Sequence, residues 1–343
     1  MREMSKLKKL SICIPTYNRP NCLRELLLSI ADEGIEEIEV VVCDDASPED
    51  PTKIIHEFKS SIPDLKYIRH PSNIGLDRNF LSVVHHASGE YVWLIGDDDV
   101  IEPGGIGRVL GALESKPKVT GLTLGVVDYD AEMKNLVGIR NTPDSQYFST
   151  AAEVFSEVSS LLGFMSALVV DRAAWAEVIA RDPIEEYQNY YVQVYILGRA
   201  LLAHGGWRIV NEPCVRFRTD NDQLTAKFGW FRRLSFDVEA YGKLANGLFP
   251  ADVSTRRSIR QATLKVHVVA KILNLKTRSE ENVNVLSTAL YLGRNYWDLP
   301  GYWAVALPLL LTPRLFVRLL RHAYQKFSWR SGTARARQFE SNG

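Results

Sequence analysis

The sequence predicts an α/β fold: a mostly parallel central sheet with helices on both faces, followed by a helical region. Three observations predict it. Short apolar runs alternate with segments of helical spacing over the first hundred residues, each apolar run ends in polar residues, and the pattern becomes helical from about residue 221. Strands that alternate with helices are typical of βαβ units, whose sheets are buried on both faces. The expected domains are residues 1–220, which hold the sheet, and residues 221–343.

Hydrophobic periodicity gives the individual elements. Apolar runs predict strands at residues 10–14, 38–43, 66–70, 91–95, 119–127 and 164–170, and a further strand that starts with "WRIV". Apolar residues at helical spacing predict helices at 20–31, 50–59, 76–87, 254–275 and 283–297. Residues 128–160 show no readable motif and are expected to form loops.

Composition limits the function classes. The 343 residues include 41 basic and 41 acidic ones, so overall charge gives no indication of a nucleic-acid partner. The four cysteines lack metal-ligand spacing. The basic start, "MREMSKLKKLSICIP", has no long apolar segment and no small-residue cleavage site, which argues against a signal peptide. We expect a cytoplasmic protein.

Three adjacent carboxylates, Asp97, Asp98 and Asp99, follow the apolar run "YVWLI". Like charges this close repel one another unless they are solvated or neutralised. Either the triplet is a solvated turn, or it binds a cation. Oxygen ligands suit Mg²⁺ or Mn²⁺, so we expect a divalent metal that also neutralises substrate phosphates.

Polar residues follow the other predicted strands as well, in "PTYN", "CDDAS" and "HPSNIG". In open α/β sheets ligands bind beyond the carboxyl ends of the strands. Polar ends on all four strands therefore predict one site at that edge.

The stretches "LSICIPTYNRP", "EVVVCDDASPED", "NIGLDRNF" and "ASGEYVWLIGDDDVIEPGGI", in this order, resemble the family 2 glycosyltransferases of the GT-A fold. The resemblance covers residues 8 to 110 well and weakens toward residue 220. The "IGDDD" form is similar to a subset that builds O-antigen and other bacterial surface polysaccharides, the abequosyltransferase-like proteins among them.

The resemblance implies a role for individual residues. Nucleotide-sugar binding is implied for Pro15, Thr16, Tyr17, Asp44, Asp45, Asn73, Arg78 and Asp97. Asp98 matches the metal ligand, and Asp99 could orient the metal's waters or the acceptor. Asp45 has an alternative role, the capping of the next turn.

The sequence departs from the family pattern at two places. Many members read Asp-x-Asp-Asp, whereas the first of these positions here is Gly96. The family's catalytic base falls near Gln193 and Val194, neither of which can accept a proton. The nearest acidic residues are Glu186 and Glu185, which could instead be a solvated helix start, where acids are favoured. Another alternative is Asp222.

Residues 302–330 combine an apolar face, a basic face and aromatic residues. This pattern predicts a helix that lies on an anionic membrane surface. The alternative is a helix that packs on the catalytic domain or on a second subunit.

The resemblance as a whole implies a metal-dependent, inverting glycosyltransferase. Its donor is a nucleotide-diphospho-sugar, and its acceptor is a glycan, which could be linked to a polyprenyl diphosphate at the inner face of the plasma membrane. The alternative is a catalytically impaired relative that binds a nucleotide or a glycan. A dinucleotide-dependent oxidoreductase is excluded because no Gly-x-Gly-x-x-Gly follows a predicted strand.

Overall fold

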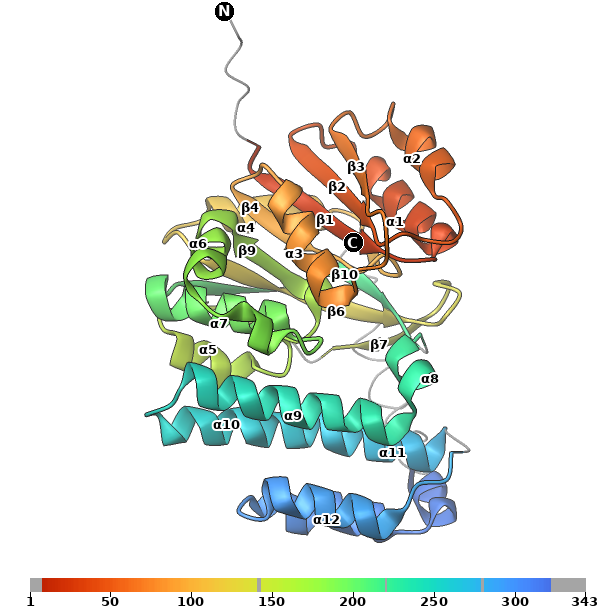
Figure 1. Ribbon diagram of the computed structural model, residues 1–343, viewed down its shortest axis with the longest axis vertical. Coiled ribbons are helices and arrows are strands. Elements are labelled where there is room, and N and C mark those ends of the chain that lie inside the picture. Colours follow the sequence, from red (N-terminus) through yellow and green to blue (C-terminus); the bar gives the residue numbers. More distant parts are fainter. Residues whose placement is uncertain (1–7, 141–142, 220, 279–280, 322–343) are drawn as a thin grey trace, which may run out of the picture. The chain divides into compact units, whose positions relative to one another are not determined.

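The computed structural model describes residues 8–140, 143–219, 221–278 and 281–321 (Figure 1). The chain divides into two compact units. Unit 1 comprises Met1–Asp222 and Lys243–Ser258, and unit 2 comprises Gln223–Gly242 and Ile259–Gly343.

Unit 1 is built on a ten-stranded sheet whose main path runs β3-β2-β1-β4-β9-β6-β10-β5. Its first half is parallel and consists of β1 (Leu10–Thr16), β2 (Ile38–Asp44), β3 (Leu65–Arg69) and β4 (Tyr91–Leu94). Every residue of β1 and β2 is buried, which explains why these strands are mostly apolar.

The second half of the sheet is mixed. It consists of β5 (Val100–Ile101), β6 (Gly121–Tyr129), β7 (Leu136–Ile139), β8 (Tyr147–Phe148), β9 (Leu168–Asp171) and β10 (Trp207–Arg218). Strand β9 runs antiparallel between β4 and β6, whereas β10 runs parallel to β6. Strands β7 and β8 pair with β6 and β10 and lie off the main path.

Helices cover both sides of this sheet (Figure 1). They are α1 (Pro20–Asp32), α2 (Thr52–Phe58), α3 (Leu76–His86), α4 (Gly105–Glu114), α5 (Ala151–Val158), α6 (Arg172–Arg181) and α7 (Val192–His204), with short 3₁₀ turns η1 (Met165–Ala167) and η2 (Ile184–Tyr187). Helix α1 buries Leu23, Leu26, Leu27 and Ile30, the stripe that its sequence spacing predicts.

The predicted fold class is confirmed, with one difference in detail. The expected strands and helices of the first hundred residues lie within a few residues of the observed ones. Residues 128–160 were expected to be loops, but they contain β7, β8 and α5. Strands β7 and β8 are short and mostly exposed, so they carry little hydrophobic periodicity.

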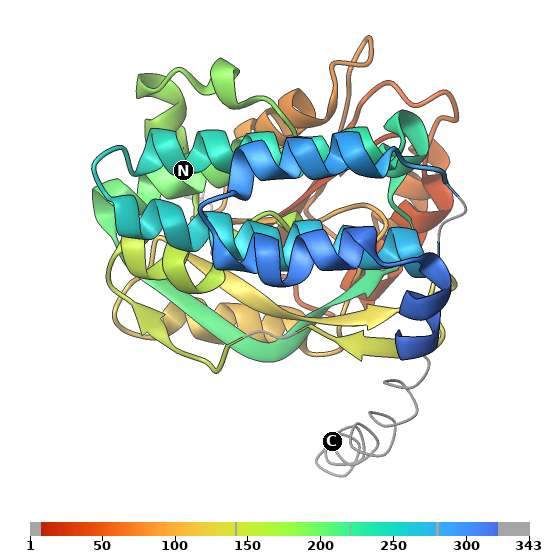
Figure 2. The same cartoon turned by 90° about the horizontal axis from the view of Figure 1, so that it is seen from below.

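Unit 2 is helical. Its helices are α8 (Gln223–Phe228), the first part of α9 (Trp230–Leu248), the last part of α10 (Val253–Thr263), η3 (Leu264–Val269), α11 (Ala270–Thr277), α12 (Val285–Tyr296), η4 (Tyr302–Ala306) and α13 (Leu307–Leu311). They enclose a hydrophobic core of their own, which includes Trp230, Leu264, Leu292 and Tyr302. Figure 2 shows α12 beside the η4–α13 segment.

The strand register places the polar strand ends of unit 1 next to one another. Thr16 at the end of β1 pairs with Asp44 at the end of β2, and Asp44 pairs with Arg69. Leu94 at the end of β4 pairs with Cys13, so the chain needs only three more residues to bring Asp97 to the level of Thr16. The carboxyl edge of the parallel strands is thereby established as one continuous surface.

Candidate active site

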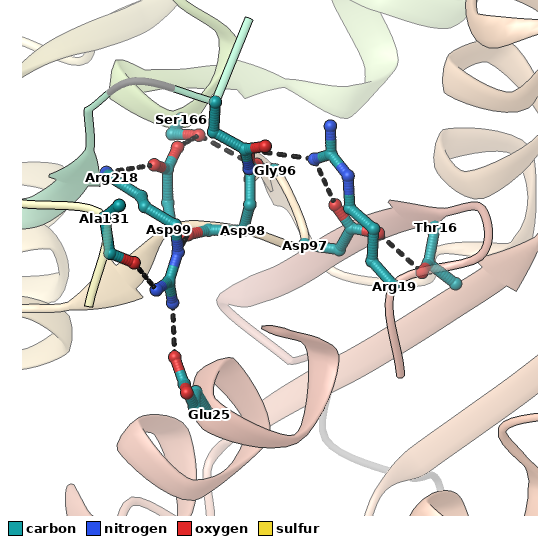
Figure 3. A network of polar contacts seen from close by, with 11 residues as sticks. Thr16, Arg19, Glu25, Gly96, Asp97, Asp98, Asp99, Ala131, Ser166 and Arg218 are labelled. Carbon is teal, nitrogen blue, oxygen red and sulfur yellow. Dashed lines mark hydrogen bonds and ion pairs between the residues drawn. The ribbon is translucent and has the colours of Figure 1, made fainter. Parts of the chain in front are cut away.

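The acidic turn, Gly96–Asp99, lies directly beyond β4 at the carboxyl edge (Figure 3). Asp97 and Asp99 are buried. Asp98 is less enclosed, with 18% of its side chain exposed. Three neighbouring carboxylates in such a place require nearby cations or hydrogen-bond donors, because water is largely excluded.

A guanidinium group lies between the first two carboxylates. Nη1 of Arg19 lies 3.0 Å from Oδ1 of Asp97 and 2.8 Å from Oδ2 of Asp98 (Figure 3). Arg19 immediately precedes α1, whose first residue, Pro20, fixes the start of the helix. The other oxygen of Asp97 accepts a 2.6 Å hydrogen bond from Oγ1 of Thr16.

Burial raises the pKa of Asp97 to about 6, against the opposing attraction of Arg19. Burial, and next the negative charge of Asp98, raise the pKa of Asp99 to about 8. Asp99 accepts hydrogen bonds from the hydroxyl of Ser166 and, at 3.2 Å, from the backbone N–H of Arg218. Burial and the charge of Asp98 thus raise the pKa of Asp99 and favour its protonated form, whereas these two hydrogen bonds act in the opposite direction.

Asp98 is also held by residues at and just after the end of β10. Nε of Arg218 donates to the backbone carbonyl of Asp98 at 3.0 Å, and the same guanidinium contacts Glu25 of α1 and the carbonyl of Ala131 (Figure 3). Nδ2 of Asn221 donates to Oδ2 of Asp98 at 2.7 Å. The acidic turn is thus held by segments that are far apart in the sequence.

Sequence reasoning missed four of these supporting residues, Arg19, Ser166, Arg218 and Asn221. Arg19 stood inside the motif "PTYNRP" and was assigned no role. A surplus of negative charge on the turn was a signal that a cation from the same edge should lie beside it. Ser166 and Arg218 gave no such signal, because only the tertiary fold brings them to residue 99.

Gly96, where many family members have an aspartate, lies against the other carboxylates. A Cβ atom at this position would lie 3.0 Å from Oδ1 of Asp98 and 3.5 Å from Oδ2 of Asp99. Its backbone N–H donates to Oγ of Ser166 at 2.9 Å. A side chain at position 96 would therefore require the carboxylate of Asp98 to shift by a few tenths of an ångström.

The acidic turn fits a divalent cation at one position. Within the described residues, no group of three His, Cys, Asp or Glu side chains could hold a metal ion. Oδ2 of Asp98 is occupied by Arg19 and Asn221, while Oδ1 receives no hydrogen bond from any residue that the structure describes. Asp98 can therefore supply one oxygen ligand, and a substrate diphosphate and water would supply the others.

The "CDDAS" pair divides into two structural roles. Asp44 is fully buried, and its oxygens accept from Ser47 at 3.0 Å and from the hydroxyl of Tyr67 at 3.0 Å. Asp45 accepts from the backbone N–H groups of Ile74, at 2.6 Å, and Gly75, at 3.0 Å. Asp45 therefore holds the "NIG" loop against the end of β2, which differs from the capping of its own next turn.

The remaining residues expected to bind the nucleotide also lie at this edge. Pro15 is buried in β1, and Tyr17 follows that strand with 44% of its surface exposed. Asn73 and Arg78 are exposed on the loop before α3 and on its first turn. Among the described residues, Arg78 has no hydrogen-bond or ion-pair partner. The nucleotide-binding roles of these residues stay predictions.

The acidic residues considered as the catalytic base lie on other segments. Glu185 and Glu186 are exposed on η2, and Oε2 of Glu186 lies 3.5 Å from Nζ of Lys243. Asp222 is exposed and follows Asn221, which contacts Asp98. Neither glutamate contacts the acidic turn within the described part of the chain, so the choice of base stays a prediction.

The start of α7 is buried rather than acidic. Gln193 is buried there, and its Oε1 lacks a hydrogen-bond donor in the described residues. Asp77 of α3 accepts from the backbone N–H groups of Tyr190, at 2.9 Å, and Val192, at 3.5 Å. The loop before α7 is thereby fixed to the segment that follows the "NIG" loop.

We expect Asp99→Asn to remove a pH dependence of stability. The pKa of Asp99 in the folded state, about 8, lies above the value of about 3.9 expected in an unfolded chain. The stabilisation of the protonated form is complete below the lower value and is lost as pH rises through the higher one. The free energy of unfolding of the variant, relative to wild type, should therefore increase between about pH 5 and pH 8, by up to about 1.4 kcal/mol per pH unit.

Urea unfolding at several pH values measures this difference. Asp130→Asn is a matched control, because Asp130 is partly exposed and its pKa is lowered by hydrogen bonds from Asn135 and from the backbone of Lys134. The control should show no such increase. A relative stability of Asp99→Asn that stays constant over this range would mean that Asp99 is ionised throughout.

We expect Arg19→Gln to destabilise the protein by about 3 kcal/mol, because it leaves Asp97 and Asp98 without their shared cation. Added Mn²⁺ should restore part of this loss without any nucleotide, and it should stabilise wild type less. Thermal unfolding with and without Mn²⁺ measures both effects. Arg24→Gln is the control, because Arg24 lies on α1, which Arg19 precedes, in an exposed ion pair with Glu57. Equal effects of Mn²⁺ on all three proteins would contradict the expectation.

Comparisons with known proteins agree with this geometry. Residues 11–166 match the family described as "Glycosyl transferase family 2". The abequosyltransferase RfbV of Salmonella typhimurium is 28% identical over 279 residues, which cover 75% of this chain and 80% of the relative. A Campylobacter jejuni protein, GalNAc(5)-diNAcBac-PP-undecaprenol beta-1,3-glucosyltransferase, is 28% identical over 105 residues, which cover 30% of this chain and 34% of that protein.

Solved structures show the same fold. The structure of S. aureus TarS residues 1–349 superposes with a TM-score of 0.59 at 18% identity, over 94% of this chain and 92% of that chain. The same TarS fragment has been solved with UDP and with UDP-GlcNAc, with TM-scores of 0.57 and 0.59. The resemblance drawn from the sequence motifs is confirmed. The chain contains a family 2 glycosyltransferase domain of the GT-A fold, and the protein is a glycosyltransferase.

Proposed function

We propose that the protein transfers a sugar from a nucleotide-diphospho-sugar to a glycan acceptor during the synthesis of a bacterial surface polysaccharide. The observation that carries this proposal is the acidic turn, which places one accessible carboxylate, Asp98, at the carboxyl edge of the parallel strands. Relatives named as an abequosyltransferase and a glucosyltransferase support the reaction class.

The nucleotide is proposed to bind along the ends of β1 and β2. Tyr17 and Arg78 are exposed there and free to contact a ligand, whereas Asp44 and Asp45 are already engaged by protein donors. Arg78 is proposed to bind a diphosphate oxygen, because a guanidinium forms strong paired hydrogen bonds with phosphate. Asp97 and Thr16 would then fix the ribose side of the pocket through the hydrogen bond that they share.

Asp98 is proposed to hold Mg²⁺ or Mn²⁺. When bound, the metal supplies electrostatic stabilisation of the leaving diphosphate as a Lewis acid. Arg19 lies within 2.8 Å of the same carboxylate. Donor binding is therefore expected to change the contacts of Arg19, since a metal ion at Oδ1 of Asp98 and the guanidinium at Oδ2 of the same carboxylate would repel each other.

The acceptor is proposed to be linked to a polyprenyl diphosphate, and the protein to act on the cytoplasmic face of the plasma membrane. The name of the Campylobacter relative, an undecaprenol-linked glycan glucosyltransferase, supports such an acceptor. Transfer is proposed to invert the anomeric centre, with a carboxylate that deprotonates the acceptor hydroxyl. Glu186 is the proposed base, and Glu185 and Asp222 are the alternatives.

We expect calorimetry to identify one nucleoside diphosphate, among UDP, GDP, CDP and dTDP, that binds tightly only when Mn²⁺ or Mg²⁺ is present. Asp98→Asn should weaken that binding by at least about tenfold, because the only accessible carboxylate of the acidic turn is lost. Asp128→Asn is the control, since Asp128 lies on β6 and forms an ion pair with Arg140. Metal-independent binding of equal strength in wild type and Asp98→Asn would remove the metal from the proposal. No binding of any nucleotide would contradict the donor class.

We expect Glu186→Gln to lower kcat by about 10²- to 10⁴-fold and to leave nucleotide affinity unchanged, as for the loss of a general base. Glu185→Gln is a matched control of the same size on the same turn. Release of nucleoside diphosphate from the sugar nucleotide, with a membrane extract as acceptor source, measures the rate. If kcat is unchanged in Glu186→Gln but is lowered strongly in Glu185→Gln or in Asp222→Asn, the residue whose variant loses activity is the base.

A further inference from the structure

Helix α12 of unit 2 has two opposite apolar faces. Thr288, Leu292 and Tyr296 face the core of unit 2 and are buried. Leu286, Leu290 and Trp297 repeat at helical spacing on the opposite side, and Trp297 has 67% of its surface exposed. A helix that is apolar on both sides needs a second apolar environment in addition to its own core.

The segments after α12 continue this exposed surface. Trp303, Val305 and Leu311 are exposed on η4 and α13, whose other side buries Tyr302, Ala306 and Leu310 in the same core. The helix Arg314–Arg321 adds exposed Leu315, Phe316, Leu319 and Leu320. Figure 2 shows α12 and the η4–α13 segment lying side by side. These ten exposed side chains are called the apolar face below.

The charges around the apolar face are mostly positive. The described residues 281–321 contain four arginines, Arg294, Arg314, Arg318 and Arg321, and two acidic residues, Glu281 and Asp298. Asp298 is paired with Arg260 at 2.6 Å. The apolar face therefore carries a net positive charge, which is complementary to a surface of anionic lipids.

A pocket of about 220 Å³ lies among the same segments. It is lined by Leu275, Lys276, Val283, Val285, Leu310 and Arg314. Lys276 is 7% exposed, and its Nζ donates to the carbonyl of Thr312 at 3.0 Å. Burial, and next the charge of Arg314, lower the pKa of Lys276. Two cations with apolar walls form a site that suits a phosphate group attached to an apolar chain.

The described helices that carry the apolar face are short relative to the thickness of a bilayer. None of the helices that the structure describes is long and apolar enough to span a bilayer by itself. Among the described residues, one pair of helices, Tyr302–Leu311 and Arg314–Arg321, is long and apolar enough to span when taken together. The two helices are bent by 111°. A bilayer core needs about 20 residues of continuous helix. Two short helices with a sharp bend can instead both lie within the interface.

We propose that the apolar face docks the protein on the surface of an anionic lipid bilayer, with the pocket at Lys276 and Arg314 binding the phosphate of a lipid headgroup. The proposal rests on the proposed function in that it places the enzyme where a lipid-linked acceptor would be. Trp297 and Trp303 are suited to the headgroup level, because indole rings favour the boundary between lipid and water. The predicted membrane helix at 302–330 is thereby extended to include α12, and its residues 322–330 lie outside the described part of the chain.

Co-sedimentation of the full chain with vesicles tests this proposal. The protein should bind vesicles of phosphatidylglycerol and phosphatidylcholine at least about tenfold more tightly than vesicles of phosphatidylcholine alone, and added salt should weaken the binding. Trp297→Ser combined with Trp303→Ser should lower the affinity by at least about tenfold. Val253→Ser is the matched control, because Val253 is 66% exposed on α10, away from these segments in the sequence.

Arg314→Gln tests the pocket. It should weaken binding to the anionic vesicles and also the weak binding to phosphatidylcholine, because both lipids carry a headgroup phosphate. Inorganic phosphate at millimolar concentration should not displace the wild-type protein from anionic vesicles, because the lipid chain contributes to the site. Displacement by phosphate would show that the pocket takes free phosphate and would overturn this part of the proposal.

Two results would overturn the docking proposal. One is a wild-type protein that does not bind anionic vesicles. The other is a dimer in solution that the double tryptophan variant converts to a monomer without any effect on vesicle binding, since the apolar face would then bind a second copy. Calorimetry with the nucleoside diphosphate is repeated on each variant. Retained nucleotide binding shows that the variant is folded, and it separates failure of the membrane proposal from failure of the proposed function.

Discussion

The neutralisation of the acidic turn is the constraint on which the catalytic unit depends. Three adjacent carboxylates cannot be buried at the end of β4 unless cations and hydrogen-bond donors surround them. The donors come from the loop before α1, from η1, and from the end of β10. Residues far apart in the sequence must therefore all be in place before Asp97, Asp98 and Asp99 can adopt this arrangement.

This constraint also gives the three carboxylates different properties. Asp97 is shared between a hydroxyl and a guanidinium, Asp99 is enclosed enough to favour its protonated form, and only Asp98 keeps an accessible oxygen. A single accessible carboxylate beside buried neighbours is suited to an enzyme whose substrate brings its own diphosphate, because the substrate completes the set of oxygen ligands. The site is thereby arranged for a charged ligand that arrives from solution.

Unit 2 also has a surface that requires a partner, but its exposed groups are apolar. Its helices bury one side in a hydrophobic core and leave Trp297, Trp303 and eight other large apolar side chains exposed. Such a surface is costly in water and is expected to be covered in the working state. The arginines around it and the cationic pocket at Lys276 make an anionic bilayer the most suitable cover.

The sequence by itself determined the α/β order of the first half, the four polar strand ends and the glycosyltransferase class. These features are local: strand periodicity, turn residues and short motifs can all be read within about ten residues. Strands β7 and β8 were not predicted because they are short and mostly exposed, and the antiparallel direction of β9 depends on its distant partners β4 and β6.

Only the tertiary structure decided which residues serve the acidic turn. The sequence indicated that three carboxylates needed a cation. It did not indicate that Arg19 lies between Asp97 and Asp98, or that the side chains of Arg218 and Asn221 also contact Asp98. For Asp45 the sequence indicated either a nucleotide contact or the capping of its next turn, whereas in the fold it accepts from the backbone N–H of Ile74. Charge can be counted along a chain, but which charges meet is decided by the packing of strands and loops that the chain order does not reveal.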